Sequence, residues 1–169
     1  MIAHTKPFRP GSSSPLPSRD TSPREADGFL KPGSLVAVTG ATGLVGNNVV
    51  RLLHNRGLRV RAIVRPRPQS VDRSLADLPV EISQGRLSDT AFLAQACEGA
   101  DLVIHTAAMV HIGRRHYDEM WRTNVDGSRH IAQAAHRAGA TMVHVSSVDA
   151  IVLRSDGQPA DEDTPPGGL

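Results

Sequence analysis

The stretch that most constrains how this chain can fold runs from residue 35 to residue 46, LVAVTGATGLVG. Its first four residues are apolar and rich in valine, which is typical of a buried parallel strand. Three glycines spaced three apart follow, and behind them apolar residues recur at helical spacing. A strand, a glycine-rich turn and a helix in this order are the context that a dinucleotide-binding fingerprint requires.

Each glycine of this turn has its own expected role. Gly40 allows the tight turn after the strand, and Gly43 lets a pyrophosphate approach the backbone at the helix N-terminus. Gly46 has no side chain that would separate the helix from the strand. The alternative is a glycine-rich turn without a ligand, which the flanking strand and amphipathic helix disfavour.

Strand and helix signals alternate along the rest of the chain. Four further strands are short and apolar at their centres: residues 58–64, 80–82, 101–105 and 141–145. Between them we expect three helices: a short one around 70–78, one that follows the N-cap Asp89 and runs to about Cys97, and a long one over 116–138. This alternation requires right-handed crossovers and a parallel sheet covered on both faces. The predicted fold is an α/β doubly wound parallel sheet, a three-layer Rossmann fold with strand order 3-2-1-4-5, truncated after the fifth strand.

Composition divides the chain into three parts. Residues 1–32 are rich in proline and serine with few aliphatic residues, so we expect a disordered tail, either regulatory or an over-long translated leader. Residues 33–153 form the expected NAD(P)-binding domain. Residues 154–169 are polar and proline-rich, which indicates a loop.

Composition also argues against several kinds of function. Net charge is +2 and aromatic residues make up 3% of the chain, which disfavours nucleic-acid binding. No apolar run approaches the ~20 residues of a membrane span. The single cysteine, Cys97, lies in an apolar helical stretch and is expected to be a buried thiol, so a cytoplasmic protein is the default expectation. His105 and His144 lie in or beside strands, where we expect packed or hydrogen-bonded histidines rather than metal ligands.

The end of the second strand bears on the choice between NAD and NADP. An acidic residue there would bind the ribose 2′-hydroxyl, whereas a basic one accommodates a 2′-phosphate. The strand ends Val64-Arg65-Pro66-Arg67, with no carboxylate before Asp72. Arg65 can grip a phosphate through its planar fork, so it favours NADP, with NAD as the alternative. The competing interpretation is a solvated surface arginine.

Taken together, the motifs resemble those of the short-chain dehydrogenase/reductase superfamily, in its extended branch of NAD-dependent epimerases, dehydratases and dihydroflavonol-reductase-like enzymes. Six segments carry the resemblance in the family's order: TGATGLVG at 39–46, VRAIVRP at 60–66, DLVIHTAA at 101–108, NVDGS at 124–128, VHVSS at 143–147 and DEDTP at 161–165. One match fails, because Arg86 stands where the family usually has an aspartate that contacts adenine. Arg86 could either stack on adenine or point into solvent, and we expect it to point into solvent.

The resemblance implies roles for individual residues. The pyrophosphate would be held by the turn residues Gly40, Thr42, Gly43, Leu44, Val45 and Gly46. Leu87 would keep a backbone contact to the cofactor, and Thr106, Ala107 and Ala108 would line the path of the adenosine and nicotinamide ribose. Asn124 would support the site from the long helix, and Ser147 would be the catalytic serine that hydrogen-bonds the substrate hydroxyl or carbonyl.

The family's catalytic Tyr-x-x-x-Lys pair is missing from this sequence. The only tyrosine, Tyr117, is followed four residues later by Trp121, and the only lysines are Lys6 and Lys31. The resemblance therefore implies the N-terminal, cofactor-binding part of an NAD(P)-dependent oxidoreductase or epimerase whose small-molecule substrate the sequence does not identify. Its pair would lie beyond this chain, which would be inactive alone. The alternatives are a non-catalytic NADP(H)-binding redox sensor and a truncated relic without function. A homodimer through residues 116–138 is a further expectation of the resemblance.

Overall fold

The computed structural model describes residues 29–66, 73–111 and 115–147, together with residues 150, 160, 161, 163 and 164. Five strands form one sheet in the order β3-β2-β1-β4-β5, and all four pairings are parallel. The strands are β1 (Leu35–Thr39), β2 (Arg59–Val64), β3 (Glu81–Gln84), β4 (Leu102–His105) and β5 (Thr141–His144). The predicted fold class and strand order are confirmed. The predictions for residues 1–28 and most of 154–169 lie outside the described residues.

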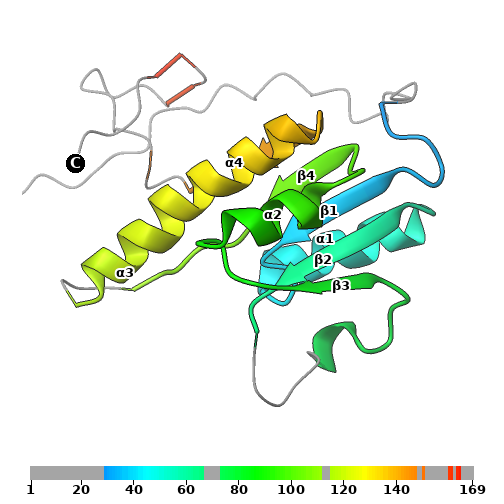
Figure 1. The fold of residues 1–169 in the computed structure, drawn as a ribbon, viewed down its shortest axis with the longest axis horizontal. Helices are drawn as coiled ribbons and strands as arrows, with labels where there is room; N and C mark the ends of the chain where they lie inside the picture. Colours follow the sequence, from blue (N-terminus) through cyan, green and yellow to red (C-terminus); the bar gives the residue numbers. More distant parts are fainter. Residues whose placement is uncertain are drawn as a thin grey trace, which may run out of the picture.

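Helices cover both faces of the sheet (Figure 1). One face carries α1 (Leu44–Asn55), and the other carries α2 (Thr90–Cys97) and a long helix built from α3 (Tyr117–Trp121), η2 (Arg122–Asp126) and α4 (Gly127–Arg137). No helix within the described ranges combines the length and the apolar character needed to cross a bilayer.

The central strand β1 is buried along its whole length, and its alternation divides the core in two. Leu35 and Ala37 pack with α2 and α4, whereas Val36 and Val38 pack with α1. This is the expected period of two in a sheet that is covered on both faces. Cys97 is buried in the first of these clusters, as predicted, and burial raises the pKa of its thiol to about 11.

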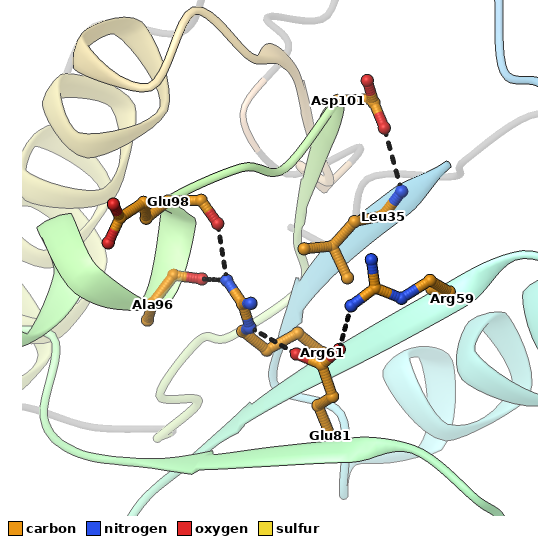
Figure 2. Close-up of polar contacts among 7 residues, drawn as sticks. All are labelled: Leu35, Arg59, Arg61, Glu81, Ala96, Glu98 and Asp101. Atoms are coloured by element: carbon orange, nitrogen blue, oxygen red, sulfur yellow. Dashed lines mark hydrogen bonds and ion pairs between the residues drawn. The ribbon is translucent and has the colours of Figure 1, made fainter. Parts of the chain in front are cut away.

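A polar clamp at the amino edge of the sheet joins β2, β3 and α2 (Figure 2). The guanidinium of Arg61 donates from Nε to Glu81 Oε2 at 2.9 Å and from Nη1 to the carbonyls of Ala96 and Glu98 at 3.1 and 2.8 Å. These carbonyls close the C-terminal end of α2, where a cation is favourable. Hydrogen bonds from Arg59 and then Arg61 lower the pKa of the Glu81 carboxyl.

Replacing Arg61 with methionine tests this clamp. The side chain of Arg61 is only 18% exposed, so the change removes three hydrogen bonds and leaves acceptors without their donor. We expect Arg61→Met to lower the free energy of unfolding by about 1–2 kcal/mol in urea denaturation. Arg59→Met is the matched control: Arg59 is 61% exposed and shares the same carboxylate, so its loss should cost at most about 0.5 kcal/mol. Equal effects in the two variants would contradict this assignment.

Two helix predictions need correction. The predicted helix around 70–78 is a 3₁₀ turn, η1 (Arg73–Leu75), within the part that the structure describes. The long helix does cover nearly all of 116–138, but it is interrupted by the π-helical turn η2. A π turn inserts one residue into the helical repeat. The α4 residues that reach the core are therefore Gly127, Ile131, Ala134 and Ala135.

Candidate functional site

The turn between β1 and α1 is closed by backbone contacts that leave no room for side chains at two glycines. Gly40 has a φ of 66°, and a Cβ added there would lie 2.7 Å from the backbone nitrogen of Ala107. A Cβ added at Gly46 would lie 2.2 Å from the carbonyl oxygen of Gly40. The turn itself is fixed by the amide of Gly43, which donates to the carbonyl of Gly40 at 2.8 Å. Both positions therefore require glycine for steric reasons.

The N-terminus of α1 lies open at the end of this turn. Gly43 is its N-cap residue and, being glycine, offers no side-chain oxygen to the first-turn N–H groups. The apolar side chains of Leu44 and Val45 are 84% and 51% exposed at the same place. An open helix N-terminus presents amide donors and the positive end of the helix dipole, which together suit an anion.

The segment after β4 packs directly on the glycine turn. Thr106 donates from Oγ1 to the carbonyl of Thr39 at 2.7 Å, and the amide of Ala107 donates to Thr39 Oγ1 at 3.3 Å. The structure therefore brings together Gly40, Gly46, Thr106 and Ala107, four of the residues that the sequence singled out. Thr42 is half-buried within the same turn, and Ala108 is exposed.

Asn124 fixes the same segment from the long helix. Its side-chain Oδ1 accepts from the amide of Met109 at 2.8 Å, and its Nδ2 donates to the carbonyl of Met109 at 2.9 Å. This two-point contact holds the chain beyond Ala108 against η2. Asn124 therefore orders the backbone that follows Thr106 to Ala108, and its role at a bound cofactor stays a prediction.

The remaining predicted residues lie around this centre. Arg65 follows β2 and Ser147 lies three residues beyond β5, so both are at the carboxyl edge of the sheet, and both are exposed. Arg86 is exposed, as expected. The backbone carbonyl of Leu87 accepts from Nδ1 of His130 at 2.9 Å, which links the turn after β3 to α4.

Sequence reasoning missed two groups of residues, and the first lies on α1 behind the glycine turn. On α1, Arg51 makes a two-pronged contact with Asp77 at 2.8 and 2.9 Å and donates to the carbonyl of Ser74. Asn47 donates to the same carbonyl. These contacts hold residues 74–77, in the connection that begins with Arg65, against the helix that starts at the glycine turn. The sequence signal for these contacts was the pair of polar residues Asn47 and Arg51, which are four residues apart and so lie on one face of α1.

A second missed group surrounds His105, which the sequence placed only as packed or hydrogen-bonded. The ring is fully buried, with Nδ1 2.6 Å from Thr39 Oγ1 and Nε2 3.0 Å from Ser128 Oγ. The ring of His144 stacks on it with centroids 5.2 Å apart. Burial, and then the nearby His144, lower the pKa of His105 to about 4, so its ring is neutral at pH 7.

A doubly wound parallel sheet with a glycine turn between β1 and α1 defines the Rossmann class of folds. The chain belongs to the NAD dependent epimerase/dehydratase family, whose model matches residues 36–168.

The chain is also similar to individual proteins and to solved structures. The chain is 42% identical over 121 residues to the sterol demethylase protein B of Methylococcus capsulatus, a match that covers 71% of this chain and 36% of that protein. It is 40% identical over 116 residues to the ceramide reductase of Caulobacter vibrioides, covering 69% and 35%. A crystal structure of a short-chain dehydrogenase/reductase superfamily protein from Agrobacterium tumefaciens with bound NAD is 32% identical, with a TM-score of 0.65 and coverage of 78% and 38%. The chain thus spans about a third of the length of the curated relatives it matches.

Proposed function

We propose that this chain forms the NAD(P)-binding part of an extended short-chain dehydrogenase/reductase, with residues 33–153 as the binding domain. The observation that carries the proposal is the open N-terminus of α1 beside the sterically closed glycine turn. A cradle in which two glycines exclude side chains, and which presents first-turn amides, fits a pyrophosphate. The NAD-bound relative supports the same ligand class.

In this proposal each residue at the carboxyl edge has a binding task. The pyrophosphate lies on the turn formed by Gly40, Thr42, Gly43, Leu44, Val45 and Gly46. Leu87 lies on the adenine side, whereas Thr106, Ala107 and Ala108 line the path of the ribose groups. Asn124 acts indirectly, because it orders the backbone at Met109.

The bound dinucleotide would supply or accept hydride at its nicotinamide, opposite a carbinol or carbonyl carbon of the substrate. Ser147, exposed beyond β5, would orient the substrate oxygen by a hydrogen bond. Two relatives are named for a sterol and a ceramide, which favours a lipid carbonyl such as that of a sterol, with flavonoids and nucleotide-sugars as alternatives. We place the protein in the cytoplasm, since its single cysteine suits a reducing compartment.

A second candidate function is binding without chemistry. Tyr117 is the only tyrosine, and no lysine follows it, so this sequence contains no Tyr-x-x-x-Lys pair. We therefore expect the 169-residue chain to bind the dinucleotide without turning it over.

A homodimer partner would pack on α3, where Tyr117 and Trp121 are 54% and 43% exposed.

Arg65 provides the test of cofactor choice. If its guanidinium grips a 2′-phosphate, Arg65→Ala should weaken NADPH binding about tenfold and change NADH binding less than about twofold, as expected for one charge-assisted contact. Fluorescence titration with each reduced cofactor measures both. Arg59→Ala is the control, because Arg59 is exposed on the same strand at the opposite edge of the sheet. A wild-type chain that binds neither cofactor would refute the proposed function, and an unchanged NADPH affinity in Arg65→Ala would leave Arg65 a solvated arginine.

A further inference from the structure

His105 makes two side-chain contacts that join elements on different sides of the candidate site. Its Nδ1 meets the hydroxyl of Thr39, the last residue of β1 before the glycine turn. Its Nε2 meets the hydroxyl of Ser128, one turn beyond Asn124 on the long helix. Thr39 is 1% exposed and His105 is fully buried, so water does not compete for the bond between them, whereas the bond to the half-buried Ser128 is partly shielded.

The donor and the acceptor of each hydrogen bond around His105 follow from the groups at the two ends of the series. Ser128 Oγ lies 2.6 Å from the carbonyl oxygen of Asn124, and a carbonyl only accepts, so the single proton of this hydroxyl is directed there. Ser128 Oγ must then accept from His105, which places the proton of the neutral ring on Nε2. The unprotonated Nδ1 accepts from the hydroxyl of Thr39, whose oxygen in turn accepts from the amide of Ala107.

The result is one continuous relay: Ala107 N–H to Thr39, Thr39 to His105, His105 to Ser128, and Ser128 to the carbonyl of Asn124. The last acceptor lies in the π-helical turn η2, where the regular helical hydrogen-bond pattern is altered. Asn124 in turn holds both backbone groups of Met109 through its side chain. A bond between Ser128 and a carbonyl four residues earlier is a contact known to bend helices locally.

We propose that His105 is a positioning residue: as the Nε2–H tautomer it ties the glycine turn to the π-helical turn, and so holds Asn124 against Met109. This series of hydrogen bonds holds the glycine turn after β1 in place relative to the π-helical turn η2. Only the statement that a cofactor lies at this edge rests on the proposed function.

The tautomer is measured first, on the full chain labelled with ¹⁵N-histidine. A long-range ¹H–¹⁵N correlation spectrum should show a His105 ring protonated at Nε2 alone at pH 7, assigned by the signal that disappears in His105→Gln. A ring protonated at Nδ1, or at both nitrogens, would overturn the proposal. This measurement requires no ligand.

Two matched pairs of variants then test positioning. The amide nitrogen of Gln in His105→Gln lies near the former Nε2 and can still donate to Ser128, whereas the shorter Asn in His105→Asn reaches only Thr39. We expect hydrogen exchange at the Met109 amide to accelerate at least about tenfold in His105→Asn and at most about threefold in His105→Gln, as expected from one lost hydrogen bond. Ser128→Ala should behave like His105→Asn, and Ser128→Thr, which keeps the hydroxyl, should behave like the wild type.

The outcomes separate positioning from simple packing. If exchange at the Met109 amide accelerates equally in both His105 variants, or does not accelerate in Ser128→Ala, His105 only fills space. Should the His105 variants not fold, the Ser128 pair decides alone. Affinities for NADH and NADPH in the same variants should follow the exchange rates. A wild-type chain that binds neither cofactor refutes the proposed function, while the tautomer and exchange results still decide on the relay.

Discussion

Gly43→Asp is expected to lower the affinity of the chain for NADPH and NADH about 100-fold, or about 2.7 kcal/mol, without unfolding it. Gly43 has ordinary extended backbone angles of −80° and 170°, and a Cβ there would lie 3.2 Å from the carbonyl oxygen of Gly40, a tight contact that requires this carbonyl to shift by a few tenths of an ångström. Aspartate is a favourable N-cap residue, because its carboxylate accepts from first-turn amides. Those amides are the groups that the pyrophosphate needs, and the added charge repels it.

The matched control is Gly43→Asn, which has nearly the same shape and also caps helices but carries no charge. We expect its affinity loss to be about tenfold smaller than that of Gly43→Asp, with a similar melting temperature. Both variants are measured by fluorescence titration and thermal unfolding. If Gly43→Asp binds both cofactors as tightly as the wild type does, the pyrophosphate does not lie at α1.

Acidification is expected to destabilise the chain through His105. Its folded-state pKa of about 4 lies below the ordinary value of 6.5, so the unfolded state takes up a proton that the folded state refuses. The contribution of neutral His105 to the free energy of unfolding is complete above about pH 6.5 and is lost as the pH falls towards 4. Between pH 7 and pH 5 the free energy of unfolding should fall by about 2 kcal/mol in urea titrations.

The control for this pH effect is His105→Gln, which cannot be protonated. The variant should lose less than about 0.5 kcal/mol over the same interval, because it lacks the ring whose protonation the folded state disfavours. Hydrogen-bonded carboxylates such as Asp77 and Glu81 also have lowered pKa values and also destabilise on acidification, but only below about pH 4.5. A variant that is as pH-sensitive as the wild type between pH 7 and 5 would show that His105 is not the responsible group.

The sequence predicted the sheet because its strands and glycines act locally. The run from Leu35 to Gly46 carries its own strand period, turn chemistry and helical period, and the alternation after it predicted a parallel sheet with right-handed crossovers. The strand order 3-2-1-4-5 followed from the Rossmann class that the dinucleotide-binding fingerprint indicates. The glycine turn was found because its residues act locally, whereas Thr106 and Ala107 were identified through the resemblance of the segment DLVIHTAA to the family. What could not be predicted are contacts between side chains far apart in the sequence.

The His105 relay and the Arg61 clamp both show this limit. His105 and Thr39 are 66 residues apart, and Arg61 reaches carbonyls 35 and 37 residues later, so no short pattern announces either contact. The π-helical turn was missed because a single inserted residue shifts the apolar periodicity without erasing it. These polar contacts join the elements that the apolar pattern had already placed.

Amide chemical-shift mapping of the ¹⁵N-labelled chain, during titration with NADPH and with NADH, would locate the cofactor on the protein. We expect saturable shifts at Gly40, Gly43 and Gly46 and at Thr106 to Ala108, in the segments that meet where β1 and β4 end. Arg65 should shift more with NADPH than with NADH. Saturable shifts confined to another part of the chain, or no shifts with either cofactor, would contradict a dinucleotide site at the glycine turn.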